Sequence, residues 1–298
     1  MPIARRGLLA GAVALGASAV LPFAPPASAD VALPLIGPVT GNGIGVMSFN
    51  LRTATDTGDR AWVNRLSRVR RLIRQEHPTI LGTQEGRLHQ IRDLKAELPG
   101  YGCVFHGRDA DGTGETTAIL FDKSRVKKVD SGHLWLSDTP HRAGSITWGN
   151  KFPRTMTWVM FDDKRTGKRF VHVNTHFDHV SASSRRRSAD MVRNRMKKFK
   201  LPTVLTGDFN TTPGGVPHAT LVKGAFHDAW NHPTKRVTPA YSTTNGWNPT
   251  PKRTGHRIDW IIVSGGITVR KVGVNTWVPN SRLTPSDHWA MQAVVAIG

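Results

Sequence analysis

Thr203-Val-Leu-Thr-Gly-Asp-Phe-Asn210 is a short apolar run that ends in a carboxylate and an amide, and this arrangement decides the fold. Runs of this length with β-branched residues are typical of buried strands. Similar polar groups end four further strand candidates, namely Phe49-Asn50, Gln84-Glu85, Asn174-Thr-His176-Phe-Asp178 and Ser286-Asp287-His288. Because strands can carry such groups out of a core to a shared rim, we expect them to meet there.

Each of these groups also has a structural interpretation when it is taken alone. Asn50 could cap a turn, Glu85 could pair with Arg87, and Asp208 could form an Asx turn. Independent turn residues have no reason to follow strand after strand, so the repeated pattern favours one common site. A hard cation would find oxygen ligands at such a rim.

The rest of the chain alternates between strand candidates and amphipathic helices. We expect helices at residues 59–76 and 184–199. Further strands are expected at residues 45–50, 79–85, 101–105, 116–121, 155–161, 170–175, 257–263, 269–274 and 289–296. No change in composition interrupts this pattern, so residues 44–298 are interpreted as one α/β domain.

The first 29 residues are expected to be an export signal. Arg5 and Arg6 precede a short apolar run, and Ala27-Ser-Ala29 offers a cleavage site. The paired arginines resemble a twin-arginine signal; an ordinary secretory signal and an uncleaved anchor are the alternatives. We therefore expect a secreted protein in which residues 30–43 form a linker.

The formal net charge of +20 is expected to draw the protein to polyanions, whether nucleic acid, anionic lipid or phosphate-bearing wall polymer. Many arginines fall on the two expected helices, where a solvated outer face is favoured over contact with a nucleic acid. Cys103 is the only cysteine, which excludes an intramolecular disulfide and a cysteine-based zinc site. The sequence implies no stable protein partner, and we expect a monomer.

Six motifs together carry a resemblance to a known family. They are Ser48-Phe-Asn-Leu-Arg52, Gln84-Glu85, Asn174-Thr-His-Phe-Asp178, Gly207-Asp-Phe-Asn210, Arg257-Ile-Asp259 and Ser286-Asp-His288. Their residue types and their order resemble the endonuclease/exonuclease/phosphatase family, over residues 44–298. The resemblance implies a four-layer α-β-β-α sandwich, with two packed mixed β-sheets flanked by helices, and a metal-dependent hydrolase of phosphate esters.

The resemblance also implies a metal site and a site for the attacking water. Glu85, helped by Asn50 and Asp287, would hold Mg²⁺, with Mn²⁺ or Ca²⁺ as alternatives. Asp208 and Asn210 would orient the water and the phosphoryl oxygens, while the metal neutralises charge in the transition state.

Two carboxylate–imidazole pairs are implied in the same way. His288 would be oriented by Asp259, and His176 by Glu115. Phosphodiester cleavage needs one group to remove a proton from water and another to supply a proton to the leaving group, and the assignment of the two histidines to these roles stays open.

Arg87 and Arg108 match family positions that approach the substrate phosphates, and a guanidinium group suits a phosphate oxyanion. The alternative is that both are ordinary surface arginines of a basic protein. The loop between Trp135 and Trp148, which contains His141 and Arg142, is a further candidate for substrate contact.

The sequence leaves the substrate open among three hypotheses. The first is a secreted nuclease acting on extracellular DNA or RNA by metal-assisted attack of water. The second is a phosphodiesterase or phosphatase for lipid head groups, as in sphingomyelinases, or for wall polymers. The third, an inactive polyanion-binding protein, is disfavoured because every central polar group of the motifs is present.

Overall fold

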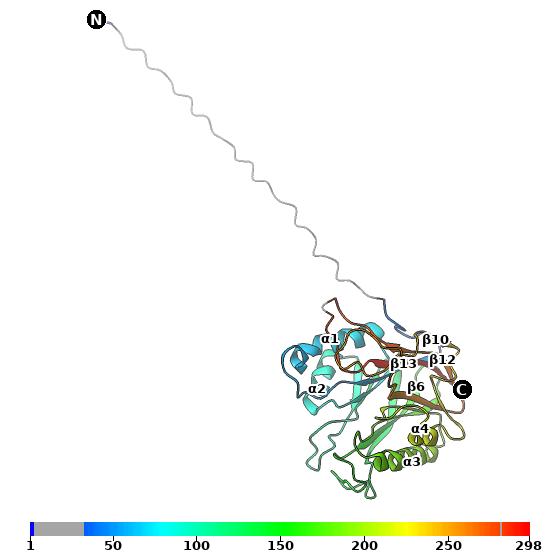
Figure 1. Ribbon diagram of the computed structural model, residues 1–298. Coiled ribbons are helices and arrows are strands. Elements are labelled where there is room, and N and C mark those ends of the chain that lie inside the picture. Colours follow the sequence, from blue (N-terminus) through cyan, green and yellow to red (C-terminus); the bar gives the residue numbers. More distant parts are fainter. Residues whose placement is uncertain (3–32, 281) are drawn as a thin grey trace. The chain divides into compact units, whose positions relative to one another are not determined.

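The computed structural model describes residues 1–2, 33–280 and 282–298 (Figure 1). The expected export signal, apart from its first two residues, and the beginning of the linker lie outside the described residues. Residues Pro34–Gly298 form one compact unit. The compact body therefore begins at Pro34 and includes most of the segment that we interpreted as a linker.

Two β-sheets form the centre of this unit. The first contains β1 (Gly43–Asn50), β2 (Ile80–Gln84), β3 (Tyr101–Val104), β4 (Ile119–Asp122), β10 (Lys235–Arg236), β12 (Ile267–Asn275) and β13 (Ala290–Ile297). The second contains β5 (Val126–Trp135), β6 (Thr155–Asp163), β7 (Arg169–His176), β8 (Thr203–Asp208), β9 (Phe226–Asp228) and β11 (Asp259–Ser264).

Both sheets are mixed, as predicted. The seven strands of the first sheet have the order β10-β12-β13-β1-β2-β4-β3, in which β1 is parallel to β2 and antiparallel to β13. The six strands of the second have the order β5-β6-β7-β8-β11-β9, in which β8 is parallel to β7 and antiparallel to β11.

Helices cover the outer face of each sheet, which completes the predicted four-layer sandwich (Figure 1). The first sheet carries α1 (Trp62–Glu76) and α2 (Leu88–Glu97), and the second carries α3 (Ala182–Lys198) and α4 (Val216–Leu221). The alternation of side chains along β1 shows how the layers form. Ile44 and Val46 pack between the sheets, whereas Met47 and Phe49 pack in the cluster that contains α1 and α2.

The segment of residues 34–42 is here called the N-terminal strap. The carboxylate of Glu76, the last residue of α1, holds this strap in place. Three consecutive backbone N–H groups, those of residues 35–37, donate hydrogen bonds to the buried carboxylate of Glu76. The side-chain amide of Asn275 donates to the same group. The strap is therefore held by charge-assisted hydrogen bonds, which are stronger than bonds between neutral groups.

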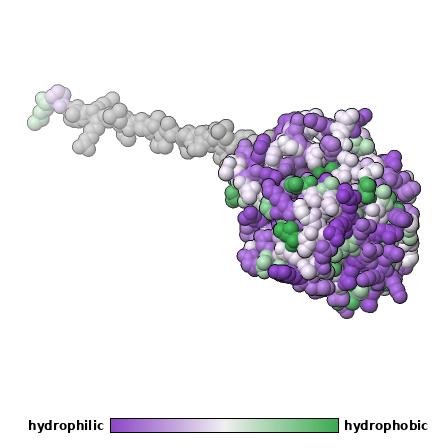
Figure 2. All heavy atoms as spheres, turned by 60° about the horizontal axis from the view of Figure 1, so that its bottom comes forward, coloured by the Kyte–Doolittle hydropathy of each residue, from purple (hydrophilic) through white to green (hydrophobic). Residues whose placement is uncertain are grey.

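The surface fits the composition of the chain. The face shown in Figure 2 is mainly hydrophilic, and its apolar side chains lie in small separate spots. In the part of the chain that the structure describes, no helix has both the length and the apolar character needed to cross a membrane.

Several boundaries differ from the sequence predictions for local reasons. The first helix begins at Trp62, not at residue 59, because residues 58–60 form a separate 3₁₀ turn and Ala61 leaves the helical region with ψ 143°. Five helices and strands were missed, namely α2, α4, β5, β9 and β10. Helix α2 buries too few apolar residues to show a clear period, and β5 is an edge strand whose exposed residues 127–130 include two lysines, a usual protection for a sheet edge.

Arg65 departs most from the expectation that the helix arginines lie on a solvated face. Its side chain is fully buried, and its guanidinium donates hydrogen bonds to the backbone carbonyls of Leu51, Arg52, Arg60 and Pro285. This arginine therefore fastens α1 to the loops that follow β1 and precede β13.

Candidate active site

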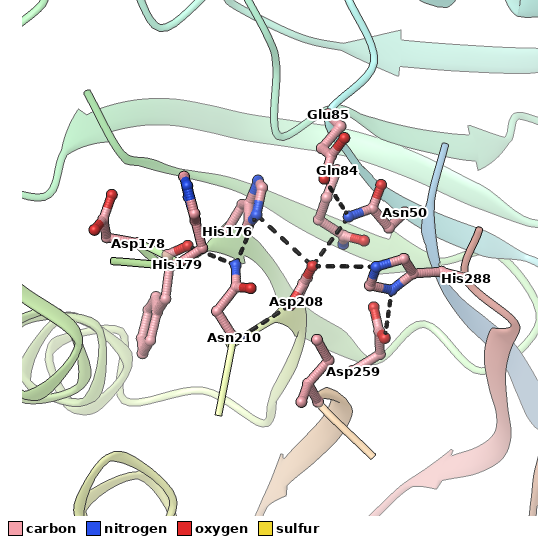
Figure 3. A network of polar contacts seen from close by, with 12 residues as sticks. Asn50, Gln84, Glu85, His176, Asp178, His179, Asp208, Asn210, Asp259 and His288 are labelled. Carbon is pink, nitrogen blue, oxygen red and sulfur yellow. Dashed lines mark hydrogen bonds and ion pairs between the residues drawn. The ribbon is translucent and has the colours of Figure 1, made fainter. Parts of the chain in front are cut away.

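The register of the strands brings the predicted polar groups together. In the second sheet, His176 of β7 lies opposite Asp208 of β8, and Asp208 lies opposite Asp259 of β11. In the first sheet, the last residue of β1, Asn50, lies opposite Gln84 of β2. The polar ends of both sheets therefore converge on one place, as Figure 3 shows.

Asn50 joins the two sheets at this place. Its side-chain nitrogen donates to Glu85 Oε1 at 2.9 Å and to Asp208 Oδ2 at 3.0 Å. Its side-chain oxygen accepts a hydrogen bond from the backbone of Arg52, and the backbone of Thr53 donates to the second oxygen of Glu85. Two carboxylates from different sheets are thus held on either side of one amide.

Glu85 has a backbone conformation that suits this position. Its φ of 62° lies in the left-handed region, which non-glycine residues adopt at a cost. The turn directs the side chain away from the end of β2 toward Asn50 and Asp208 (Figure 3). Backbone strain of this kind is concentrated at functional sites.

The carboxylates and imidazoles of the site are close enough to share a metal ion. Ligand atoms of Glu85, His176 and Asp208 lie within 4.8 Å of one another, and so do those of Asp208, Asp259 and His288. The oxygen donors of Glu85 and Asp208, with the amide of Asn50 between them, form a donor set that fits a hard divalent cation.

Asp287, the third predicted metal ligand, lies beside the same group of residues. Its carboxylate is 3.7 Å from the guanidinium of Arg52. Burial raises its pKa, the neighbouring His288 opposes this effect, and the charge of Glu85 adds to it. The carboxylates of Asp287 and Glu85 are therefore close enough to repel each other, as two carboxylate ligands of one cation site would.

His288 forms the predicted pair with Asp259. Its Nδ1 atom lies 2.9 Å from Asp259 Oδ2, and its Nε2 atom lies 3.9 Å from Asp208 Oδ2. Burial disfavours the imidazolium, but the charges of Asp259, Asp208 and Asp287 outweigh it and hold the pKa of His288 well above its usual value. This histidine is therefore set to carry a proton at neutral pH.

The predicted pair of His176 with Glu115 is wrong. Glu115 is bound instead by the guanidinium of Arg108, and His176 contacts Arg154 at 3.0 Å and the amide of Asn210 at 3.0 Å. Burial, together with the guanidinium groups of Arg154 and Arg108, holds the pKa of His176 well below its usual value. At neutral pH His288 is therefore protonated, whereas His176 is neutral.

Asp208 lies between the two histidines. Its Oδ1 atom accepts a hydrogen bond from the backbone of Asn210 at 2.9 Å, and its Oδ2 atom is 3.7 Å from the Nε2 atom of His176. Burial, reinforced by the charge of Asp259, raises the pKa of Asp208 to about 7. A carboxylate with this pKa can accept a proton near neutral pH.

A cavity of about 380 Å³ opens beside these residues. Its lining includes Glu85, His176 and Asn210, and also four arginines, namely Arg52, Arg87, Arg108 and Arg154. The predicted phosphate-contacting residues Arg87 and Arg108 both line it, whereas the loop of residues 135–148 contributes none of the lining residues. Contact of that loop with the substrate stays a prediction.

Several residues of this cavity were missed by the sequence analysis, among them Arg154 and Phe152. Arg154 directly precedes β6, and Phe152 lies two residues before it. The signal that would have found them is their position at the end of a predicted strand, since the neighbouring strands also carry functional groups at their ends. Asp178, which was quoted in a motif without a role, is fully buried and accepts a hydrogen bond from Arg154.

The fold is a sandwich of two mixed sheets. Carboxylates, amides and imidazoles lie at the strand ends, and arginines lie beside them. This combination is that of a phosphoester hydrolase. The model of the Endonuclease/Exonuclease/phosphatase family matches residues 47–288. The chain belongs to this family, whose members hydrolyse phosphate esters and generally depend on a divalent metal.

Solved structures agree with this assignment. An endonuclease/exonuclease/phosphatase family protein from Bacteroides thetaiotaomicron is 33% identical, with a TM-score of 0.81, and the match covers 86% of this chain and 95% of that chain. A mannosyl-6-phosphatase from the same organism is also 33% identical, with a TM-score of 0.79, covering 85% of this chain and 99% of that chain.

More distant structures share the fold. The catalytic domain of human nocturnin, solved with a bound sulfate anion, is 20% identical with a TM-score of 0.67, and the match covers 86% of this chain and 94% of that chain. A comparison with curated protein sequences gave no match.

Proposed function

We propose that this protein is a Mg²⁺-dependent hydrolase of small phosphate esters. The observation that carries the proposal is the cavity of about 380 Å³, in which four guanidinium groups face Glu85, His176 and Asn210. Its volume lies near the lower limit for small-molecule sites. Several arginines around a small cavity suit the charge of a phosphate group, because guanidinium binds phosphate oxygens in a bidentate manner.

Glu85, Asn50 and Asp287 are the proposed ligands of Mg²⁺. When bound, the ion would neutralise charge on the phosphoryl oxygens in the transition state. The hydrogen bonds from Asn50 to both Glu85 and Asp208 hold the carboxylates in position. The side-chain oxygen of Asn50 accepts one hydrogen bond, from the backbone of Arg52, and keeps a second lone pair that a cation would use.

The remaining site residues divide the proton transfers among them. Asp208, with a pKa raised to about 7 by burial, would accept the proton of the attacking water, and Asn210 would orient that water. The protonated His288, whose pKa Asp259 helps to raise, would stabilise the phosphoryl oxygens and donate its proton to the leaving alkoxide. His176, which stays neutral, would hydrogen-bond the substrate.

The mannosyl-6-phosphatase supports a phosphate monoester as the substrate, since it matches this chain at 33% identity over 85% of its length. A nuclease remains the second candidate, and the net charge of +20 favours it because positive charge attracts a nucleic-acid backbone.

A panel of phosphate esters tests both candidates. Purified protein would be incubated with hexose 6-phosphates, glycerol 3-phosphate, a chromogenic phosphodiester, sphingomyelin vesicles, RNA and plasmid DNA. We expect phosphate release from the small monoesters with Mg²⁺, loss of activity with EDTA and recovery with added Mg²⁺. Cleavage of plasmid without release of phosphate from any monoester would refute the monoesterase proposal in favour of the nuclease.

A matched pair of variants tests the site. Asp208→Asn should abolish hydrolysis, because the amide cannot accept the proton of the water. Asp162→Asn should leave hydrolysis unchanged, because Asp162 is a half-buried residue of β6 that pairs with Arg169 and does not line the cavity. Full activity of a folded Asp208→Asn protein would show that the proposed mechanism is wrong.

We also propose that the protein acts outside the cell as a monomer. The support is in the sequence, where Arg5 and Arg6 precede an apolar run and a small-residue cleavage site. Replacing both arginines by lysine should block export in a host that has a twin-arginine translocase. Unchanged amounts of the variant in the medium would contradict this route.

A further inference from the structure

Phe152 is an apolar side chain in an otherwise polar wall. It lines the cavity beside the site, and its relative exposure is 37%. Among the phenylalanine, tyrosine and tryptophan residues that the structure describes, it is the one in the exposed class. The cavity's other lining residues are all charged or polar. The ring therefore gives the cavity its one apolar surface among the lining residues.

Neighbouring side chains hold the ring in place. The guanidinium carbon of Arg108 lies 4.7 Å from the ring centroid, and the ammonium of Lys151 lies 5.5 Å from it. The imidazole of His179 stacks against the ring at 6.1 Å with an interplanar angle of 24°. Cation–π and aromatic contacts of this kind order the ring before any ligand arrives.

The backbone that carries the ring is also fixed. The side chain of Asn150 donates a hydrogen bond to the carbonyl of Phe152 at 2.6 Å. The buried carboxylate of Asp178 accepts hydrogen bonds from the backbone of Lys151 and from the side chain of Arg154. The ring is therefore held at a set position relative to Arg154, which lines the same cavity.

We infer that Phe152 is a specificity-determining residue that packs against the apolar face of a pyranose ring in the leaving group of the substrate. This inference rests on the proposed function, since it places the phosphate among the arginines of the same cavity. A pyranose has one face rich in C–H groups, which pack on the negative face of an aromatic ring. Its hydroxyl groups would face the polar lining that includes Glu115 and Arg87.

The size of the cavity favours a single sugar over a longer chain. At about 380 Å³ it suits one hexose phosphate, and its walls offer both donors and acceptors for hydroxyl groups. An acyclic phosphate ester can reach the same arginines but has no ring face to pack on Phe152. The residue therefore discriminates between leaving groups and takes no part in the chemical step.

Paired substrates and a set of variants test this inference. Steady-state kinetics with Mg²⁺ would compare mannose 6-phosphate and glucose 6-phosphate with glycerol 3-phosphate. For Phe152→Ala we expect kcat/KM on the hexose phosphates to fall about tenfold, mainly through KM, because the packing of one ring is lost. On glycerol 3-phosphate it should change by less than about twofold.

Two further variants provide the controls. Phe152→Tyr should restore the preference for hexose phosphates, because it keeps the ring. Val129→Ala, at an exposed apolar position on β5, should leave both activities unchanged. Equal values of the thermal midpoint in all variants would show that the fold is retained.

The outcomes separate the two proposals. Equal losses on both kinds of substrate, or no loss on either, would overturn the role of Phe152 while leaving the proposed hydrolase intact. A loss confined to nucleoside monophosphates would also overturn it and would indicate stacking on a base. If the wild-type protein released no phosphate from any monoester with Mg²⁺, the proposed function would fail and the inference with it.

Discussion

Replacing Arg65 by methionine should destabilise the whole protein, because this arginine joins α1 to two loops. Its fully buried guanidinium donates to the carbonyls of Arg60, Leu51, Arg52 and Pro285, at distances of 2.7, 2.7, 3.0 and 3.1 Å. Methionine has a similar length but no donor, so buried carbonyls would lose their partners. Burial already lowers the pKa of Arg65 to about 10, which shows how far the site is removed from water.

We expect the free energy of unfolding to fall by about 3 to 5 kcal/mol, because several buried carbonyls lose their charged donor and an unsatisfied buried polar group costs about 1 to 3 kcal/mol. Equilibrium unfolding in urea would measure it. The control is Arg74→Met, because Arg74 lies on the same helix with its side chain 53% exposed and should cost less than about 0.5 kcal/mol.

Arg65→Met should also weaken catalysis. Leu51 directly follows Asn50, and Pro285 lies two residues before Asp287, so loosening these carbonyls would displace two of the proposed metal ligands. A shift of about 1 Å can cost up to about 100-fold in rate, and kcat would be measured well below the unfolding midpoint. If Arg65→Met proved as stable and as active as Arg74→Met, our assignment of Arg65 as a link between helix and site would be refuted.

Three further predictions concern other buried groups. Asp259→Asn removes the charged partner of His288, and since a hydrogen bond to a charged group contributes about 1.5 to 3 kcal/mol, kcat/KM should fall about 10- to 100-fold, with Asp162→Asn as the control. Unchanged kinetics would contradict this role. Burial lowers the pKa of His172 to about 3. The unfolded chain, with a histidine pKa near 6.5, therefore binds an extra proton between these values, and stability should fall as the pH drops. His172→Gln should reduce the loss of stability between pH 7 and pH 5 by about 2 kcal/mol in urea titrations, and an identical pH dependence would argue against it. Glu76→Gln places an amide against the donors of the N-terminal strap, and should lower the free energy of unfolding by about 2 to 3 kcal/mol. Proteolysis of the strap would provide a second readout, and a variant as resistant as the wild type would rule out this anchoring.

Local sequence was sufficient to predict the polar groups at the strand ends of the site. The motifs that contain Asn50, Glu85 and Asp208 predicted polar groups at a shared rim, and the strand registers and hydrogen bonds bring them together. His288 reaches the same place from just before a strand, since β13 begins at Ala290. This prediction was possible because a strand fixes the direction of its own side chains, and because an apolar run that ends in a polar group must leave the core at that point.

The partners of buried groups could not be predicted in the same way. Glu115 binds Arg108 and not His176, and the contacts of His176 come instead from Asn210 and from Arg154, which directly precedes β6. Residue type alone favours Glu115, because a carboxylate attracts an imidazolium whereas a guanidinium such as that of Arg154 disfavours it. The choice depends on distances that the packing of the second sheet sets.

Apolar periodicity and motifs within single segments were enough to predict the class of fold, the family and the polar groups at the strand ends. The burial of Arg65, the hydrogen bonds by which Asn50 joins the two sheets, and the position of Phe152 in the wall of the cavity became apparent only in the folded chain. These features depend on segments far apart in the chain, whose relative positions are fixed by the packing of two sheets and their helices.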